Sequence, residues 1–160
     1  MKKYFLMALV MLGVTVGANA QDKELVNRHF KVGYTANVEL SATDVTMFHI
    51  TSSHGYSFGH GLYLGGGAGF GAEWGAEGVE GTPHYVPSLF LNARWSALND
   101  TVSPFVDVKA LQYIDLAEGA ARYGVTPTVG LDMGRFSLGI GYAIRFEREN
   151  AMQVSVGFVF

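Results

Sequence analysis

The chain has 160 residues, of which 11 are basic, 14 are acidic and none is cysteine. This length suits one domain, the absence of any basic run excludes nucleic acid as a partner, and the lack of cysteine excludes disulfide bonds as the stabilising device. No stretch of eighteen consecutive apolar residues occurs, which excludes a membrane protein built from helices.

Residues 1–20 have the features of a cleaved export signal. Two lysines precede an apolar stretch at 4–16, and Ala-Asn-Ala at 18–20 fits the small-x-small pattern before a cleavage point. The apolar stretch is shorter than the roughly 20 residues that a membrane-spanning helix needs. We therefore expect residues 21–160 to form the mature protein, a single domain with a formal charge of −5 once the two lysines are removed.

From residue 30 onward, apolar side chains alternate with polar or small ones, which is the period of a β-strand. Strands of about ten residues can cross a bilayer when tilted. After Leu111 the phase of the alternation is unclear, and a β-bulge is one explanation. The eight expected strands cover residues 30–40, 46–56, 62–74, 87–95, 104–110, 123–133, 136–146 and 151–160.

The two faces of these strands differ in a way that indicates an inverted barrel. One face carries bulky apolar side chains, with aromatic residues toward several strand ends, and the other is rich in glycine and serine. A soluble sandwich or lipocalin would instead have a solvated outer face with long polar side chains. The sequence therefore predicts an all-β, eight-stranded antiparallel up-and-down transmembrane β-barrel with a narrow polar lumen. The expected aromatic girdles comprise Phe30, Trp74, Trp95, Tyr123, Phe136, Phe146, Phe158 and Phe160.

The connections between the expected strands alternate in length. Short links at 58–61, 98–100 and 132–135 alternate with links at 41–44, 75–83, 114–121 and 147–150, which hold most of the loop charges. Outer-membrane barrels have short periplasmic turns and longer extracellular loops. We therefore expect a protein of the Gram-negative outer membrane, with both chain ends in the periplasm.

Three stretches of the sequence resemble a known family. "HITSSHGYSFGHGLYLGGGAGFG", "PSLFLNARW" and "SPFVDVKA" are similar to the small outer-membrane β-barrel proteins of Bacteroidetes-type bacteria, whose pattern runs HGYxF, GGGxGF, a strand ending in Arg and an aromatic, then PFVDxK. The resemblance covers nearly all of residues 21–160. It implies a fold and a cellular location, but little about biochemical activity. The architecture is similar to the OmpA and OmpX barrels, but we expect no soluble domain after the barrel of the kind that OmpA has, so peptidoglycan anchoring is not implied.

The resemblance also implies a role for the closing strand. Its alternate apolar residues Val154, Val156, Phe158 and Phe160 look like the C-terminal signal that the barrel-assembly machinery reads during insertion. The other implied partners are outer-membrane lipid and lipopolysaccharide, and we expect a monomer.

Several charged residues occupy the polar face and could form either an ion pathway or a set of salt bridges. We favour salt bridges, because eight strands leave no aqueous channel and an unpaired interior charge is costly. Arg94 is expected to pair with Asp107 or with Glu73. The expected lumen charge network comprises Lys31, Glu39, Glu73, Arg94, Asp107, Lys109, Asp132 and Arg145.

Other candidate chemistry is weak. His49, His54, His60 and His84 lack the spacing of metal ligands, and the G-x-G matches lie within an expected strand, so we expect no metal, cofactor or nucleotide site. Ser52 and His54 share a strand face and could serve a hydrolase similar to the lipid A deacylases of the outer membrane. However, no carboxylate is clearly placed to orient His54, and we do not expect an enzyme.

Three classes of function remain for the sequence. The first is a structural or surface-interaction protein of the outer membrane, the second is a binding or narrow-channel barrel, and the third is the membrane-embedded lipid A hydrolase. The loop at 75–83, with Glu77 and Glu80, could bind a cation or a partner, although a solvated loop is the simpler interpretation.

Overall fold

The computed structural model describes residues 27–44, 47–74, 83–116, 119–146 and 149–160. The expected signal at 1–20 and most of the loop at 75–83 lie outside these residues. The elements are the 3-10 helix η1 (Arg28–Phe30) and the strands β1 (Gly33–Thr43), β2 (Met47–Gly59), β3 (Leu62–Glu73), β4 (His84–Ser96), β5 (Val102–Asp115), β6 (Ala120–Met133), β7 (Phe136–Arg145) and β8 (Ala151–Val159).

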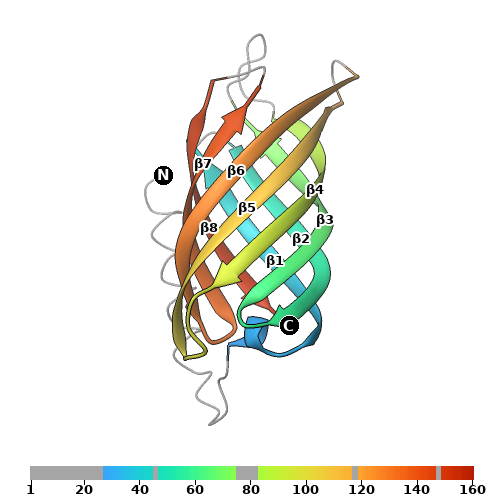
Figure 1. Cartoon of the computed structure of the whole chain (residues 1–160). Helices are drawn as coiled ribbons and strands as arrows, with labels where there is room; N and C mark the ends of the chain where they lie inside the picture. The colour runs from blue at the N-terminus through green and yellow to red at the C-terminus, as the bar shows by residue number, and fades with distance from the viewer. Residues whose placement is uncertain (1–26, 45–46, 75–82, 117–118, 147–148) are drawn as a thin grey trace.

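The eight strands form one closed antiparallel barrel in chain order, as Figure 1 shows. Each strand pairs with the next one along the chain, and β8 returns to pair with β1, in a register that places Asn37 opposite Val159. Closure leaves no strand of the barrel with a free edge. The predicted fold class is therefore confirmed. No helix among the described residues is long and apolar enough to cross a membrane.

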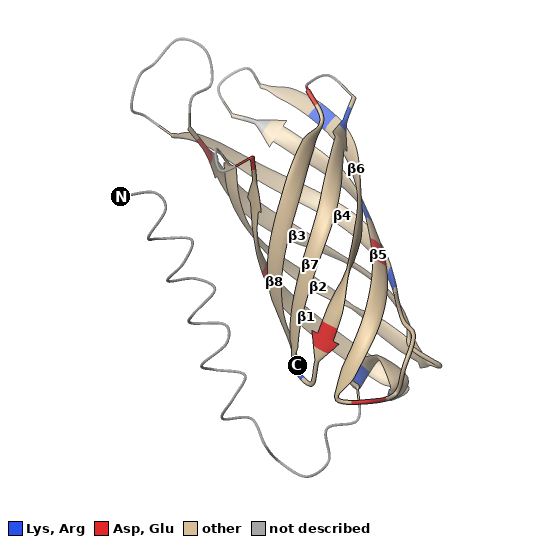
Figure 2. Cartoon of the chain, turned by 90° about the vertical axis from the view of Figure 1, so that its left-hand side faces the viewer, with Lys and Arg blue, Asp and Glu red and all other residues tan. Residues whose placement is uncertain are grey.

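The barrel carries its apolar side chains outside and its polar side chains inside. Along β1, for example, Thr35, Asn37 and Glu39 are buried in the lumen. Tyr34, on the opposite face of the strand, is exposed. The outer wall presents large apolar side chains such as Leu91, which is 70% exposed. Figure 2 shows few charged residues along the strands. The distribution is the reverse of that in water-soluble proteins, as the alternation in the sequence predicts.

Glycines on the inner face make room for aromatic rings in the lumen. A Cβ atom added to Gly130 would lie 2.6 Å from Cζ of Phe105, and one added to Gly65 would lie 2.2 Å from the hydroxyl of Tyr63. Both rings are almost completely buried. The glycines of the inner face therefore leave room for these rings. The sequence predicts that they also leave room for charged side chains.

The start of the first strand differs from the prediction. Residues 28–30 form η1, in which the Asn27 side chain accepts a hydrogen bond from the backbone N–H of His29, and β1 begins only at Gly33. The capped turn interrupts the alternation, and Lys31 lies after it as an exposed residue. The expectation that Lys31 faces the lumen is therefore wrong.

The β5–β6 hairpin is longer than predicted. The two strands continue into the loop expected at 114–121, where Asp115 pairs with Ala120, and their ladder has no irregularity. Leu111 faces inward, so an apolar side chain on the polar face obscured the alternation without any bulge. The described ladders contain a register shift elsewhere, between β2 and β3 near Ser57.

A closed barrel of this kind should stay folded in SDS unless it is heated. Its strand hydrogen bonds are satisfied within the ring, so the detergent finds no free edge at which unfolding can begin. We expect an unheated sample to migrate differently from a boiled one on a gel. Identical mobility of the two samples, with extraction by aqueous buffer alone, would contradict an inverted barrel.

Candidate functional site in the barrel lumen

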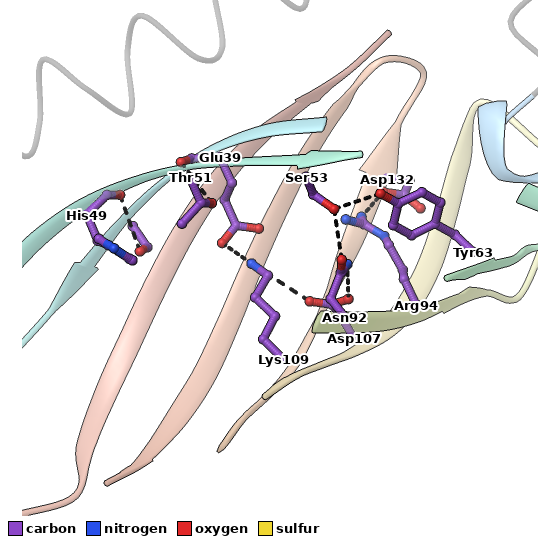
Figure 3. Close-up of polar contacts among 11 residues, drawn as sticks. Glu39, His49, Thr51, Ser53, Tyr63, Asn92, Arg94, Asp107, Lys109 and Asp132 are labelled. Atoms are coloured by element: carbon purple, nitrogen blue, oxygen red, sulfur yellow. Dashed lines mark hydrogen bonds and ion pairs between the residues drawn. The ribbon is translucent and has the colours of Figure 1, made fainter. Parts of the chain in front are cut away.

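The lumen contains a chain of hydrogen bonds that begins at an aromatic residue of β3 (Figure 3). The Tyr63 hydroxyl lies 2.6 Å from Oγ of Ser53, which donates a hydrogen bond of 2.8 Å to Oδ1 of Asn92. Because the single proton of Ser53 is used in that bond, Tyr63 is the donor to Ser53. The amide of Asn92 then donates to Oδ1 of Asp107 at 3.2 Å. Three neutral side chains thus lead to a buried carboxylate.

The same carboxylate lies beside a lysine that joins opposite walls of the barrel. The Lys109 ammonium is 3.8 Å from Oδ2 of Asp107 and forms an ion pair with Oε1 of Glu39. Lys109 belongs to β5 and Glu39 to β1, which lie four places apart in a ring of eight strands. All three side chains are buried. We call the six residues of this connected set the lumen network: Glu39, Ser53, Tyr63, Asn92, Asp107 and Lys109.

A second buried ion pair joins β4 to β6. Nη2 of Arg94 contacts Oδ1 of Asp132, whose Oδ2 accepts a hydrogen bond of 2.7 Å from the hydroxyl of Ser96. The guanidinium carbon also lies 3.5 Å from the centroid of the Phe105 ring, a cation–π arrangement. The arginine is therefore held by a carboxylate and by the face of an aromatic ring.

The partner of Arg94 differs from both partners predicted for it. Asp107 is opposite Arg94 in the ladder, but its oxygens face Asn92 and Lys109. Glu73 lies at the far end of β3, half-buried near the loops. The long arginine side chain instead reaches Asp132, because a narrow lumen brings residues of non-adjacent strands within contact distance.

Two of the remaining expected lumen charges, Glu73 and Arg145, lie at the loop end of the barrel. Arg145, the last residue of β7, donates from Nε to the backbone oxygen of Glu149 at 2.9 Å and is only half-buried. Glu73 occupies a similar level at the end of β3. The structure thus brings together five of the eight expected charges deep in the lumen, places two near its loop end and leaves Lys31 outside.

The turn end of the lumen is occupied by residues that precede the barrel. Asn27 and His29 are each 1% exposed. The Asn27 amide donates to Oδ2 of Asp132 at 3.4 Å, and the His29 ring lies 5.4 Å from that of Tyr63. We call this pair the mouth plug. The mouth plug was not predicted from the sequence, although asparagine is a common cap of a helical turn.

Burial controls the protonation of His29. The pKa of its imidazole is lowered from 6.5 to about 4, first by burial and then by the positive charge of Arg94, while Asp132 opposes the shift. Both ring nitrogens are buried without a hydrogen-bond partner. His29 is therefore neutral in the folded barrel at ordinary pH.

Two serine–histidine pairs lie on opposite faces of the barrel wall. In the lumen, Oγ of Ser88 is 2.9 Å from Nε2 of His49. On the outer wall, Oγ of Ser52 is 3.0 Å from Nε2 of His54, whose Nδ1 is 2.6 Å from the hydroxyl of Tyr34. Ser52 and His54 share a face, as their spacing predicts, whereas the contact with Tyr34 on the neighbouring strand was not predicted.

The four residues of the expected assembly signal lie on the outer wall of β8 and directly after it. Val154 and Phe160 are exposed, and Val156 and Phe158 are half-buried. The Phe158 ring packs edge-to-face against the rings of Phe136 and Phe160, with centroid distances of 5.0 Å and 4.8 Å. These aromatic residues form a cluster at the turn end of the barrel.

Solved structures that resemble this chain include another β-barrel. The N-terminal β-barrel domain of Pseudomonas aeruginosa OprF has 13% sequence identity and a TM-score of 0.54, over 81% of this chain and 100% of that chain. The outer membrane enzyme PagL has 12% identity and a TM-score of 0.49, over 79% of this chain and 98% of its own. The de novo designed TMB2.3 has 9% identity and a TM-score of 0.48, over 79% of this chain and 93% of its own. No family model and no curated protein sequence matches the chain. The likeness to the OprF domain concerns the fold alone.

Removal of Arg94 should destabilise the barrel strongly. Arg94→Ala leaves the buried carboxylate of Asp132 without its cation, and breaking a buried ion pair in this way costs about 3–5 kcal/mol. Chemical denaturation from detergent micelles measures the change. Arg135→Ala is the matched control, because Arg135 is exposed in the β6–β7 turn, and we expect its effect to stay within about 0.5 kcal/mol. Equal stability of the two variants would contradict the ion pair.

His29 should make the barrel less stable in acid. Its pKa is lowered on folding, so the unfolded state binds the proton more readily and stability falls as the pH drops from about 6.5 to about 4. A shift of this size corresponds to a loss of about 3 kcal/mol, complete below the folded pKa. His29→Phe, which keeps a ring beside Tyr63, should lose less stability across this window. If both proteins lost the same stability across this window, the His29 ring would have to be open to solvent in the folded barrel, which would contradict its burial.

Proposed function

We propose that this protein is an integral outer-membrane β-barrel of Gram-negative bacteria with a structural or surface-interaction role and a plugged lumen that conducts no solute. The observation that carries the proposal is the Lys109–Glu39 ion pair, which joins opposite walls inside a ring of eight strands. A pathway through the barrel would require these side chains to separate. The alternative is a barrel that binds a small solute or conducts it slowly. The bilayer experiment that closes this subsection tests it.

The filling of the lumen at several levels supports the absence of a channel. The lumen network crosses the middle, the rings of Tyr63 and Phe105 occupy the space over inner-face glycines, and the mouth plug covers the turn end. An eight-stranded barrel has an interior just wide enough for side chains. Ions that entered would have to displace buried charges from their partners, at a cost of several kcal/mol each.

The outer wall supports insertion into a lipid bilayer. Its exposed apolar side chains would otherwise face water over the full circumference of the barrel, an arrangement that monomeric soluble proteins avoid. Contacts with lipid and with lipopolysaccharide are therefore part of the proposal.

Orientation and insertion complete the proposal. The start of β1 and the end of β8 lie at the barrel end that carries the turns at 60–61, 97–101 and 134–135, and we assign that end to the periplasm because periplasmic turns are short. We further propose that the barrel inserts as a monomer. The barrel-assembly machinery would recognise the outward-facing residues Val154, Val156, Phe158 and Phe160 at the end of the chain.

Planar lipid bilayers provide the test of a plugged lumen. We expect wild-type protein that has inserted, as judged by its heat-modifiable mobility on SDS gels, to give no stepwise conductance. A double variant Glu39→Ala with Lys109→Ala removes the ion pair that crosses the lumen and should give small conductance steps. Reproducible steps from the wild type would contradict the proposal and favour the narrow-channel alternative.

A further inference from the structure

The inner wall at the seam between β8 and β1 carries a polar atom that no other part of the chain satisfies. Oδ1 of Asn37 on β1 is buried without a hydrogen-bond partner, and the residue is only 5% exposed. A buried acceptor that is left unsatisfied is destabilising. The position of this oxygen therefore indicates a partner that does not belong to the protein.

A glycine leaves room beside this oxygen. Gly157 of β8 is opposite Glu39 of β1 and opposite Ser137 of β7, so three strands meet at this level. The place that a Cβ atom of residue 157 would take is 2.5 Å from Oγ of Ser137, 3.3 Å from Oδ1 of Asn37 and 3.7 Å from the backbone oxygen of Val38. A hydroxyl, an amide and a backbone oxygen thus converge where other residues carry a side chain. We call Asn37, Glu39, Ser137 and Gly157 the seam site.

The buried charges of the lumen do not balance. Among the described residues, the buried carboxylates belong to Glu39, Asp107 and Asp132, whereas the buried cations are Arg94 and Lys109. With histidine counted as uncharged, one negative charge is in excess. Buried charges are normally paired with an opposite charge or coordinate a metal ion. The interior therefore requires one further positive charge.

The chemistry of the seam site suits a small metal cation. Its side-chain donors are all oxygens, which favour hard cations over soft ones, and Glu39 adds a carboxylate from the residue opposite Gly157. A single excess charge matches a monovalent ion, because a divalent ion would leave the lumen positive. Water is the other common occupant of a buried polar site. It would satisfy Asn37 but would leave the charge unbalanced.

We propose that the seam site binds one monovalent metal cation, sodium or potassium, as a resident part of the folded barrel. Asn37 and Ser137 are ligands, and Glu39 supplies the negative charge. The ion joins β1, β7 and β8 where the ring closes. It is held in place and does not pass through, so the lumen stays plugged. The inference concerns the interior alone and does not depend on what surrounds the outer wall.

The lumen contains a matched control for the seam site. Oγ1 of Thr128 on β6 is also buried without a hydrogen-bond partner, and it lies 2.6 Å from the place that a Cβ atom of Gly141 would take. Gly141 follows Ser137 on β7 by four residues, which is roughly 13 Å along a strand. Thr128→Val therefore removes an equally buried oxygen without touching the seam site.

The test measures unfolding of the full chain by urea after refolding in detergent micelles. The salts are sodium chloride, potassium chloride and N-methylglucamine chloride at equal ionic strength. The organic cation is too large for the seam site and controls for screening of charges. We expect stability to rise with sodium or potassium and then level off. The equilibrium constant for unfolding should be about ten-fold lower once the ion reaches about ten times its dissociation constant.

Variants then locate the ion. Asn37→Leu replaces the amide with an apolar group of similar size and should lose the cation-dependent shift. Glu39→Gln, which removes the excess charge, should lose it as well, and Ser137→Ala should need a several-fold higher cation concentration for half of the shift. Thr128→Val should keep the full shift. Heat-modifiable mobility on SDS gels checks that each variant is folded. If Asn37→Leu does not fold, Glu39→Gln and Ser137→Ala decide.

Three results would overturn the proposal. The first is equal stability of the wild type in all three salts, which would mean that water or a proton on a buried carboxylate takes the place of the ion. The second is an undiminished shift in Asn37→Leu, or in both Glu39→Gln and Ser137→Ala. The third is loss of the shift in Thr128→Val, which would place the cation elsewhere in the lumen.

Discussion

The pairing of β8 with β1 is the constraint on which the other features of this barrel depend. Because the ring is closed, every strand has two neighbours and the backbone needs no hydrogen bonds from its surroundings. The outer wall is then free to be apolar, and polar side chains are confined to a narrow interior. Charges in that interior are buried and must find partners across the lumen, which accounts for Lys109 between two carboxylates and for Arg94 against Asp132.

The architecture could be predicted from the sequence because it depends on a local signal. Alternation with a period of two gives strand, face and phase directly, and the inner face proposed for Glu39, Asp107 and Asp132 is the face on which the structure places them. The signal failed where a side chain did not match its face. An inward leucine at position 111 obscured a regular ladder, and a capped turn ahead of β1 moved Lys31 out of the lumen.

The contacts within the lumen could not be predicted in the same way. The partner of Arg94 depends on which side chains meet across the ring, and that is set by the stagger of the strands and by the bulk of their neighbours. Ladder position alone indicates Asp107, whereas the arginine contacts Asp132 two strands away. The contact between Tyr34 and His54 on the outer wall has the same origin, since Tyr34 lies 20 residues before His54 and meets it only through strand pairing.

The hydrogen bond from Asn27 to Asp132 implies an order of events during folding. The two residues are 105 positions apart, and the carboxylate acquires its place only when β6 has joined the ring beside Arg94 and Ser96. The segment ahead of β1 therefore cannot make this contact until a strand from the far part of the chain is in place, so the turn end is closed only around a ring that already contains β6.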